Sequence, residues 1–551
     1  MTGRKAKDLQ IRKGCRVFGC AVLLCTFFAF TSVASQAQTP SSQSTSVVQM
    51  ASQLLQNGKL TEAETILHQH IAKTPEDTKA KVLLGVVFDR QNRLTESESV
   101  YREVLRGNPR EVSALANLGV LLVHAGRQDE AVKVFEEVLR LQPQHQQAAY
   151  NLAALYSARN EQNKALPLLE TLAGITSRNR EPVTKDPALL VALAKAYAAT
   201  GKPKDAVKIV ETLEVQSPDD IRLFFTLGLI LAEAREYQNA ISLFEKVNEK
   251  VPHNFEILYN LGIAYYNLNE LDKARTELQE AADLNPGNSE VFYRLGLVAS
   301  AKNEIENAVG LWLKAVELRP DFHEANFLIA EELAKRQAYI GALQFYEKAA
   351  LQQPENLLYQ VRLGVTYIRV QQYDKARAVL ERQDKKRPDN LNVTYLKGFL
   401  ARAEGNYDEA IASFEKVLKI SPNNADGLAN LGFLANERGQ NEKAETLLRQ
   451  AINVDPKIFT AHYDLGRLLL RLKRINEAIP ILERGAELNK DDPGVRYQLF
   501  IAYSRLKQKE KADLNFAEFK RLEKKYSKTG ASATSRDKPE QIPDSVLQDK
   551  P

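Results

Sequence analysis

Cysteine is nearly absent from this chain of 551 residues. The three cysteines, Cys15, Cys20 and Cys25, all lie within residues 1–37, so the body of the chain (residues 38–551) contains none. The body therefore cannot form disulfides, thiolate metal sites or a cysteine nucleophile. A body without cysteine also suits an oxidising, exported compartment.

Known catalytic motifs are lacking as well. The sequence has no G-x-S-x-G elbow, no Walker loop, no G-x-G-x-x-G and no H-E-x-x-H. His68 and His70 are two residues apart and would lie on different faces of a helix. His323-Glu324 begins like a zinc motif, but Phe327 stands where the second histidine belongs. We therefore expect no metal, no cofactor and no enzymatic activity.

An excess of positive charge is also missing from the body. The formal net charge is +5, but residues 1–37 hold six of the 75 basic residues and one of the 70 acidic residues, which leaves 69 of each. Non-specific binding to nucleic acid depends on Lys and Arg that neutralise phosphates. The neutral body therefore argues against a nucleic-acid partner.

Residues 1–37 have the pattern of a signal peptide. A basic segment precedes an apolar run at residues 17–30, and small residues follow at Ser35 and Ala37, the −3 and −1 positions of a cleavage site. The run is shorter than the roughly 20 residues of a membrane span. We expect an exported protein, periplasmic or secreted. The alternatives are peripheral membrane association or an uncleaved N-terminal anchor in the inner membrane.

A period of 34 residues runs through the body. A small residue marks each unit, and every step between successive markers is 34 residues except one step of 41. A second small residue stands twelve positions before most markers, and proline stands twelve positions after most of them. The markers are Ala63, Ser97, Ala131, Ala165, Ala206, Ala240, Ala274, Ala308, Ala342, Ala376, Ala410, Ala444, Ala478 and Ala512.

Each unit has the pattern of a helix pair. Apolar residues recur at spacings of three and four, as in Leu115, Leu118 and Leu122, which predicts helices. A short turn, often at a glycine such as Gly126 or Gly201, would separate the two helices. The small residues would let the helices approach closely, and a bulky residue four positions after each marker would fill the gap between repeats. Proline would end the second helix, and a following Asp, Asn or Glu would help cap the next helix.

The unit resembles the tetratricopeptide repeat (TPR), whose pattern runs W-x2-L-G-x2-Y, then A-x3-F, then P. A close match is Asn260-Leu261-Gly262-Ile263-Ala264-Tyr265, followed by Ala274, Leu278 and Pro286. At the family's first Trp position this chain carries mainly Leu and Phe. The resemblance implies an all-α fold, a right-handed superhelical solenoid of about fourteen helix-turn-helix repeats of 34 residues.

The period divides the chain into segments and leaves too few residues outside the repeats for a catalytic domain. The longer step contains seven residues more than the others. These extra residues form either a plain surface insertion or a loop that acts as a hinge or contacts a partner. The predicted segments are a signal peptide at 1–37, a linker at 38–43, repeats 1–4 at 44–179, an insertion loop at 180–186, repeats 5–14 at 187–526 and a disordered tail at 527–551.

The resemblance implies a non-catalytic scaffold that binds protein or peptide partners. We expect it to act in bacterial envelope assembly, secretion or surface-polysaccharide machinery. The alternative is a regulatory or substrate-recruiting subunit for a glycosyltransferase or another enzyme that acts in trans.

In the family, positions 2, 5, 6, 9 and 13 of each first helix line the concave side. Tyr and Asn recur at positions 5 and 6 of this chain, where Asn would hydrogen-bond a peptide backbone and Tyr would pack against its side chains. Ordinary packing between repeats is the alternative. The candidate groove residues are Asn117, Asn151, Tyr259, Asn260, Tyr293, Arg294, Asn430, Tyr463, Arg467, Arg471, Tyr497 and Arg505.

Charge also varies along the predicted groove. Acidic residues such as Glu256 and Glu290 lie in its middle, and Arg467, Arg471 and Arg505 lie at its C-terminal end. Guanidinium groups hold carboxylates in a bidentate manner. We therefore predict that the basic end prefers an acidic segment or a chain terminus, against the alternative of a solvated charged face.

Overall fold

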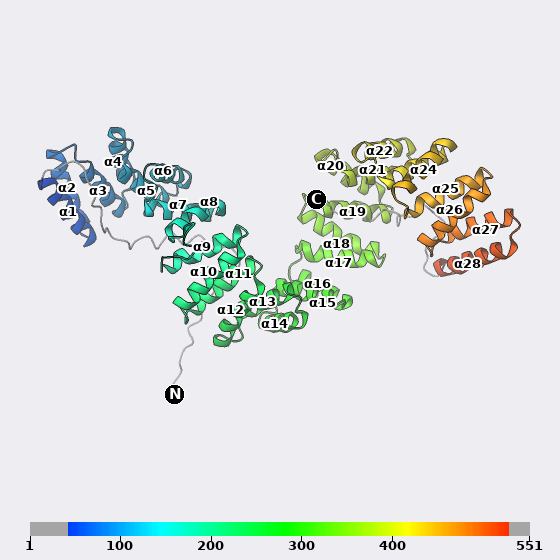
Figure 1. The fold of residues 1–551 in the computed structure, drawn as a ribbon, viewed down its shortest axis with the longest axis horizontal. Coiled ribbons are helices and arrows are strands. Elements are labelled where there is room, and N and C mark those ends of the chain that lie inside the picture. The colour runs from blue at the N-terminus through cyan, green and yellow to red at the C-terminus, as the bar shows by residue number, and fades with distance from the viewer. Residues whose placement is uncertain (1–41, 528–551) are drawn as a thin grey trace, which may run out of the picture. The chain divides into compact units, whose positions relative to one another are not determined.

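The computed structural model describes residues 42–527 (Figure 1). The predicted signal peptide and nearly all of the predicted tail lie outside the described residues. Within this range the chain forms 28 α-helices and no strand. The all-α repeat solenoid predicted from the 34-residue period is confirmed.

The helices alternate between a first and a second helix in each repeat. The first helices are α1 (Ser42–Gln56), α3 (Thr78–Arg90), α5 (Val112–His124), α7 (Gln146–Ala158), α9 (Pro187–Ala199), α11 (Ile221–Glu233), α13 (Phe255–Asn267), α15 (Ser289–Ala301), α17 (His323–Lys335), α19 (Leu357–Arg369), α21 (Leu391–Ala403), α23 (Ala425–Glu437), α25 (Phe459–Arg471) and α27 (Pro493–Arg505). The second helices are α2 (Leu60–Lys73), α4 (Leu94–Gly107), α6 (Gln128–Leu141), α8 (Gln162–Leu172), α10 (Pro203–Gln216), α12 (Tyr237–Lys250), α14 (Leu271–Leu284), α16 (Ile305–Leu318), α18 (Tyr339–Gln352), α20 (Tyr373–Lys386), α22 (Tyr407–Ile420), α24 (Asn441–Val454), α26 (Ile475–Leu488) and α28 (Lys509–Ser527).

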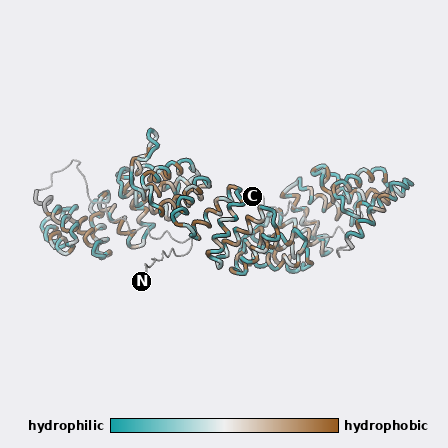
Figure 2. Tube along the Cα trace, turned by 90° about the horizontal axis from the view of Figure 1, so that it is seen from below, coloured by the Kyte–Doolittle hydropathy of each residue, from teal (hydrophilic) through white to brown (hydrophobic). Residues whose placement is uncertain are grey.

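The helices fall into two compact units, one that ends at Leu284 and one that begins at Asn285. The first unit contains α1–α14 and the second contains α15–α28. Apolar and polar residues alternate along the helices of both units (Figure 2), as expected of helices with one buried face.

Asp and Asn side chains fix the starts of most first helices. Each lies directly before its helix and accepts a hydrogen bond from a backbone N–H of the first turn, which satisfies a donor that has no partner within the helix. This confirms the predicted capping by Asp and Asn, whereas Glu111, directly before α5, makes no such hydrogen bond. The capping residues are Asp77, Asp186, Asp220, Asn254, Asn288, Asn356, Asn390, Asn424 and Asp492.

The small residue in each first helix makes room for the bulky residue of the same repeat. A Cβ atom added to Gly262 would lie 2.5 Å from Leu278 Cγ and 3.3 Å from the Ala274 carbonyl oxygen. The buried ring of Trp312 covers Gly296 in the same manner. The bulky residue therefore packs against the small residue of its own repeat, which corrects the expectation that it fills the gap between repeats.

The turn inside each repeat depends on one residue in the left-handed region. This residue always occupies the same place, two positions before the second helix. This conformation is energetically unfavourable for every residue that has a Cβ atom. Glycine occupies only some of these positions, so the other repeats carry this strain. The turn residues are Gly58, Asn92, Gly126, Asn160, Gly201, Arg235, Asn269, Asn303, Gln337, Gln371, Gly405, Gly439, Lys473 and Lys507.

Replacing Arg235 with glycine is expected to stabilise the protein by about 0.5–1 kcal/mol, because it removes left-handed strain from an exposed side chain with a φ of 62°. Chemical denaturation measures the change. Arg222→Gly is the matched control, because Arg222 is exposed inside α11, where glycine lowers helix stability by about 1 kcal/mol. A loss of stability in both variants would contradict the role of the turn residue.

The seven-residue insertion is a loop within the first unit. Helix α8 ends at Leu172, and the loop that follows folds back so that Val183 N donates to the Ala173 carbonyl oxygen at 2.8 Å. Asp186 then caps α9, and α8 and α9 pack on each other as other successive helices do. The inserted residues therefore interrupt the period without interrupting the stack.

Tyrosine–glutamate hydrogen bonds join several neighbouring repeats. In each, a tyrosine hydroxyl of a first helix donates to a glutamate carboxylate in the second helix of the preceding repeat. The five pairs are Tyr156–Glu136 at 2.5 Å, Tyr197–Glu170 at 3.0 Å, Tyr265–Glu245 at 2.6 Å, Tyr367–Glu347 at 2.7 Å and Tyr503–Glu483 at 2.5 Å.

These contacts predict a loss of stability at alkaline pH. Burial, followed by the hydrogen bond to Glu483, raises the pKa of Tyr503 to about 12, and the other four tyrosines are shifted upward for the same reasons. Below about pH 10, the pKa of tyrosine in the unfolded chain, these hydrogen bonds contribute fully to the free energy of unfolding. The contribution is lost as the pH rises through the pKa of the folded state. Denaturation midpoints should therefore fall between about pH 10 and pH 12. The fall should be shallower in Tyr503→Phe, and identical slopes in the two proteins would refute the contribution of this pair.

Candidate peptide-binding surface

The first helices form the inner side of each stack. First helices of neighbouring repeats contact each other, for example α3 with α5 and α23 with α25, whereas the described second helices show no comparable contact with one another. A stack bends toward the side where its helices are closest. We call the side chains at positions 2, 5, 6, 9, 12 and 13 of the first helices the inner face.

Asparagine side chains on the inner face are oriented by their own helices. Asn117 Nδ2 donates to the Ser113 carbonyl oxygen at 2.8 Å, and Asn260 Nδ2 donates to that of Glu256 at 2.7 Å. No described residue donates to the amide oxygens of these two asparagines. Each oxygen can therefore accept a peptide N–H, which agrees with the role predicted for them. Asn151 is half-buried at the same position of α7.

Aromatic side chains lie beside these positions. Tyr259 stacks on Phe255 in the first unit, with ring centroids 5.7 Å apart. In the second unit the Tyr293 ring lies 4.8 Å from that of Phe322, and the Arg294 guanidinium lies over the Tyr293 ring. Arg294 also pairs with Glu290 at 3.1 Å.

Tyr359 was not recognised from the sequence because it occupies position 3, outside the family's groove positions. Its ring stacks on Phe327 at 4.5 Å. Burial, followed by the charge of Glu324, raises the pKa of Tyr359 to about 12. Only 7% of Tyr359 is exposed, so its ring joins repeats 9 and 10 by packing on Phe327 and offers no open surface to a ligand.

The inner face is filled by its own side chains at repeats 11 and 12. The Arg402 guanidinium lies over the rings of Phe399 and Phe433, at 4.7 and 5.4 Å from their centroids. Arg402 Nη1 donates to Asn430 Oδ1 at 2.6 Å, and Asn430 Nδ2 donates to Tyr395 Oη at 3.0 Å. All five side chains are buried, and we call them the closed segment.

The closed segment gives Asn430 a different role from the predicted one. Its Nδ2 also donates to the Asp426 carbonyl oxygen, and its Oδ1 already accepts from Arg402. Only 6% of the residue is exposed. Asn430 therefore joins two repeats, and its amide is occupied before any peptide arrives.

The predicted basic residues lie beyond the closed segment, on α25 and α27. The Arg467 guanidinium lies over the Tyr463 ring at 5.6 Å and 4.0 Å from the buried Asp464 carboxylate. Arg471 Nη2 donates to the side-chain oxygens of Asn436 and Asn441, each at 2.5 Å. Arg505 Nη1 donates to the Leu470 carbonyl oxygen at 2.7 Å. Tyr497 is 40% exposed.

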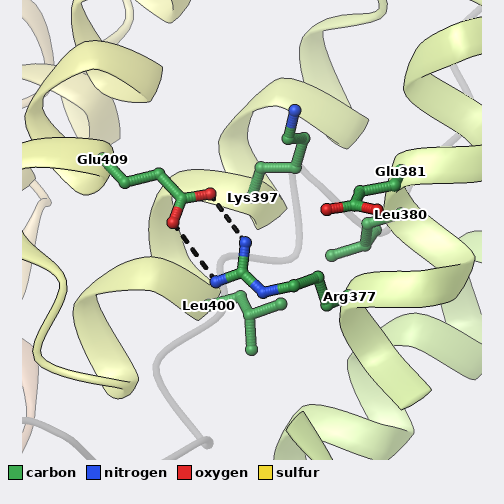
Figure 3. Close-up of a pocket in the computed structure, with 6 residues that line it drawn as sticks. All are labelled: Arg377, Leu380, Glu381, Lys397, Leu400 and Glu409. Atoms are coloured by element: carbon green, nitrogen blue, oxygen red, sulfur yellow. Dashed lines mark hydrogen bonds and ion pairs between the residues drawn. The ribbon is translucent and has the colours of Figure 1, made fainter. Parts of the chain in front are cut away.

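A small depression lies between α20, α21 and α22 in the second unit (Figure 3). Its lining includes Leu380, Lys397 and Leu400. The Arg377 guanidinium lies across it and donates to both carboxylate oxygens of Glu409 (Figure 3). The ion pair occupies this depression, which we do not count as part of the candidate surface.

Residues 42–527 contain neither a cluster of metal ligands nor a membrane-spanning helix. The described side chains contain no group of three His, Cys, Asp or Glu that could hold a metal ion. None of the described helices has the length and apolar character needed to cross a membrane.

Comparison with solved structures gives distant likenesses. The yeast protein Tom70 is 16% identical, with 79% of this chain and 96% of Tom70 covered and a TM-score of 0.33. The Naa15/Naa10 complex bound to HypK-THB is 13% identical over 92% of this chain and 99% of that one, with a TM-score of 0.36. YrrB, described as a TPR protein with an unusual peptide-binding site, is 25% identical over 33% of this chain and 95% of its own, with a TM-score of 0.30.

Family models cover most of the described chain, although no curated protein matches it. The matching models all describe the tetratricopeptide repeat. One matches residues 122–181, 231–299, 333–398 and 401–465, a second matches 48–112, 90–145 and 191–252, and a third matches 459–492. The chain therefore belongs to the tetratricopeptide repeat family.

Proposed function

We propose that this protein is a non-catalytic scaffold that binds protein or peptide partners on its inner face. The observation that carries the proposal is the set of polar and aromatic groups that lie, half-buried or exposed, on the first helices outside the closed segment. Asn117 and Asn260 present amide oxygens, and Tyr259 and Tyr497 present aromatic rings. Such groups hydrogen-bond a peptide backbone and pack against its side chains.

We further propose that the protein is exported and acts in bacterial envelope assembly, secretion or surface-polysaccharide machinery. The signal-peptide pattern of residues 1–37 and the absence of cysteine from the body support export. N-terminal sequencing of the protein from fractionated cells tests this point. A first residue at position 38, in the periplasm or medium, is expected, and an intact N-terminus in the cytoplasmic fraction would contradict it.

Site-specific photocross-linking in the native envelope tests the binding surface. A photoreactive residue at Tyr259 or Tyr497 should capture a protein partner. The matched controls are Val215 and Leu351, which are exposed on second helices at 82% and 78%. Capture only at the control positions would overturn the inner face as the binding surface. A glycosyltransferase or another enzyme among the captured proteins would support a regulatory or recruiting role in trans.

A further inference from the structure

Two neighbouring first helices at the C-terminal end present matching rows of side chains. Helix α25 carries Tyr463, Arg467 and Arg471 at spacings of four residues. Helix α27 repeats the row one unit later as Tyr497, Ile501 and Arg505. Residues four apart lie on one face of a helix, and α25 and α27 contact each other directly. We call these six side chains the C-terminal patch.

The arginines of the C-terminal patch keep their charge available. Arg471 donates to amide oxygens of Asn436 and Asn441, and Arg505 donates to the carbonyl oxygen of Leu470. These acceptors are neutral, and no described carboxylate pairs with either guanidinium. The hydrogen bonds therefore orient both groups without cancelling their positive charges, and both side chains are exposed.

Arginines on the second helices, or directly before them, are arranged differently. Arg474 pairs with Glu445 at 2.6 Å and with Glu477 at 2.7 Å. Arg449 pairs with Glu445 at 2.8 Å. Arg467, in the C-terminal patch, lies only at the edge of ion-pair distance from Asp464, at 4.0 Å. Within the patch, Arg471 and Arg505 have no carboxylate partner among the described residues, and Arg467 has one, the buried Asp464.

Aromatic rings complete the patch. The Tyr463 hydroxyl reaches the first turn of α27, where a Cβ atom added to Gly494 would lie 2.9 Å from it. The Tyr497 ring rests on Phe519 at 5.2 Å and on Phe500 at 6.0 Å, yet 40% of the residue is exposed. A supported ring with one open face provides apolar contact area at little entropic cost.

The dimensions of the patch limit the ligand. Eight residues of helix rise by about 12 Å, and two packed helices are about 8–10 Å apart. An extended chain advances about 3.3 Å per residue, so roughly four residues cover the patch. The closed segment at repeats 11 and 12 limits it on one side.

We propose that the C-terminal patch binds a short acidic segment of a partner protein, with an aromatic or long aliphatic side chain among its carboxylates. This rests on the proposed scaffold function and names the class of ligand that one part of the inner face takes. Carboxylates pair with the guanidinium groups of Arg467, Arg471 and Arg505. The apolar side chain packs against the open face of Tyr497.

The test uses the protein without its leader and fluorescein-labelled pentapeptides, each with a central phenylalanine. Fluorescence anisotropy at low salt should show the acidic pentapeptide binding at least about tenfold more tightly than its lysine counterpart, and added salt should weaken it. This comparison uses one folded protein and depends on no substitution. Equal affinities for the two peptides would overturn the proposal.

Substitutions then locate the site. The triple variant Arg467→Gln, Arg471→Gln and Arg505→Gln should weaken binding of the acidic peptide about tenfold or more. The matched control, Arg438→Gln, Arg449→Gln and Arg484→Gln, removes the same charge from outer ion pairs and should change the affinity less than about twofold. Equal weakening in both triple variants would reduce the effect to net charge and overturn the site.

Loss of folding and loss of the scaffold function are read out separately. Circular dichroism checks that each triple variant keeps its helices. Tyr497→Ala removes an exposed ring, so it should weaken binding of the acidic peptide about threefold or more without unfolding the repeat. If partners are cross-linked at Tyr259 or Tyr497 while the acidic peptide binds nowhere, the scaffold function stands and the ligand class is wrong.

Discussion

Replacing Gly262 with leucine is expected to destabilise the protein by about 1–3 kcal/mol. The first atom added at this position already meets Leu278 Cγ at 2.5 Å, and the Ala274 carbonyl oxygen lies behind it at 3.3 Å. Leu278 is itself fully buried. Helices α13 and α14 must therefore separate, and the buried contacts between them weaken.

Gly310→Leu is the matched control for this substitution. Gly310 lies inside α16, where an added Cβ atom would meet nothing within 4 Å. The same change should there stabilise the helix by about 0.5–1 kcal/mol, because leucine has the higher helix propensity. Thermal unfolding measures both effects. Repeats contact only their neighbours, so hydrogen exchange should accelerate mainly in α13, α14 and the adjoining helices. Unchanged unfolding of Gly262→Leu would refute the packing described for the small residues.

Replacing Arg402 with alanine is expected to destabilise the second unit by about 2–4 kcal/mol. The guanidinium lies over Phe399 and Phe433 and is 5% exposed. Its removal leaves a cavity over both rings and takes away the donor to Asn430 Oδ1. Leaving a buried acceptor without a donor lowers the free energy of unfolding by about 1–3 kcal/mol, and the cavity lowers it further.

The control for this substitution is Arg438→Ala in the neighbouring turn. Arg438 pairs with Asp408 of the preceding repeat, and both side chains are exposed. Exposed ion pairs contribute about 0–1 kcal/mol, so urea denaturation should separate the two variants clearly. Similar losses from both changes would mean that the stacking of Arg402 between aromatic rings contributes nothing of its own.

The repeat architecture was predictable because one strict period determines it. From the second repeat onward each first helix begins at the first residue of its predicted repeat, for example Thr78, Val112 and Phe255. Small residues at fixed spacing, proline at the end and Asp or Asn at the start are local signals, and each acts within a few residues of its own position. The partner of the bulky residue was predicted wrongly, because the spacing alone does not say which helix it touches.

The inner face was less predictable because its accessibility depends on neighbouring repeats. Asn117, Asn260 and Asn430 occupy the same position of the pattern, and each donates to its own helix. Only Asn430 is also held by Arg402 and Tyr395 of the preceding repeat. Such contacts depend on how far successive first helices are inclined, which a pattern within one repeat does not encode.

The closed segment also limits how one partner can use the second unit. An extended peptide that contacts both Tyr293 in repeat 8 and Tyr497 in repeat 14 must leave the inner face between them, because Phe399, Arg402 and Phe433 already occupy it. Such a partner binds as a bivalent ligand with two short motifs and a linker. From repeat 10 to repeat 13 the linker spans three repeat-to-repeat distances of about 10 Å each, which requires roughly nine extended residues. Its length would then set the effective concentration of the second motif, and with it the avidity of the complex.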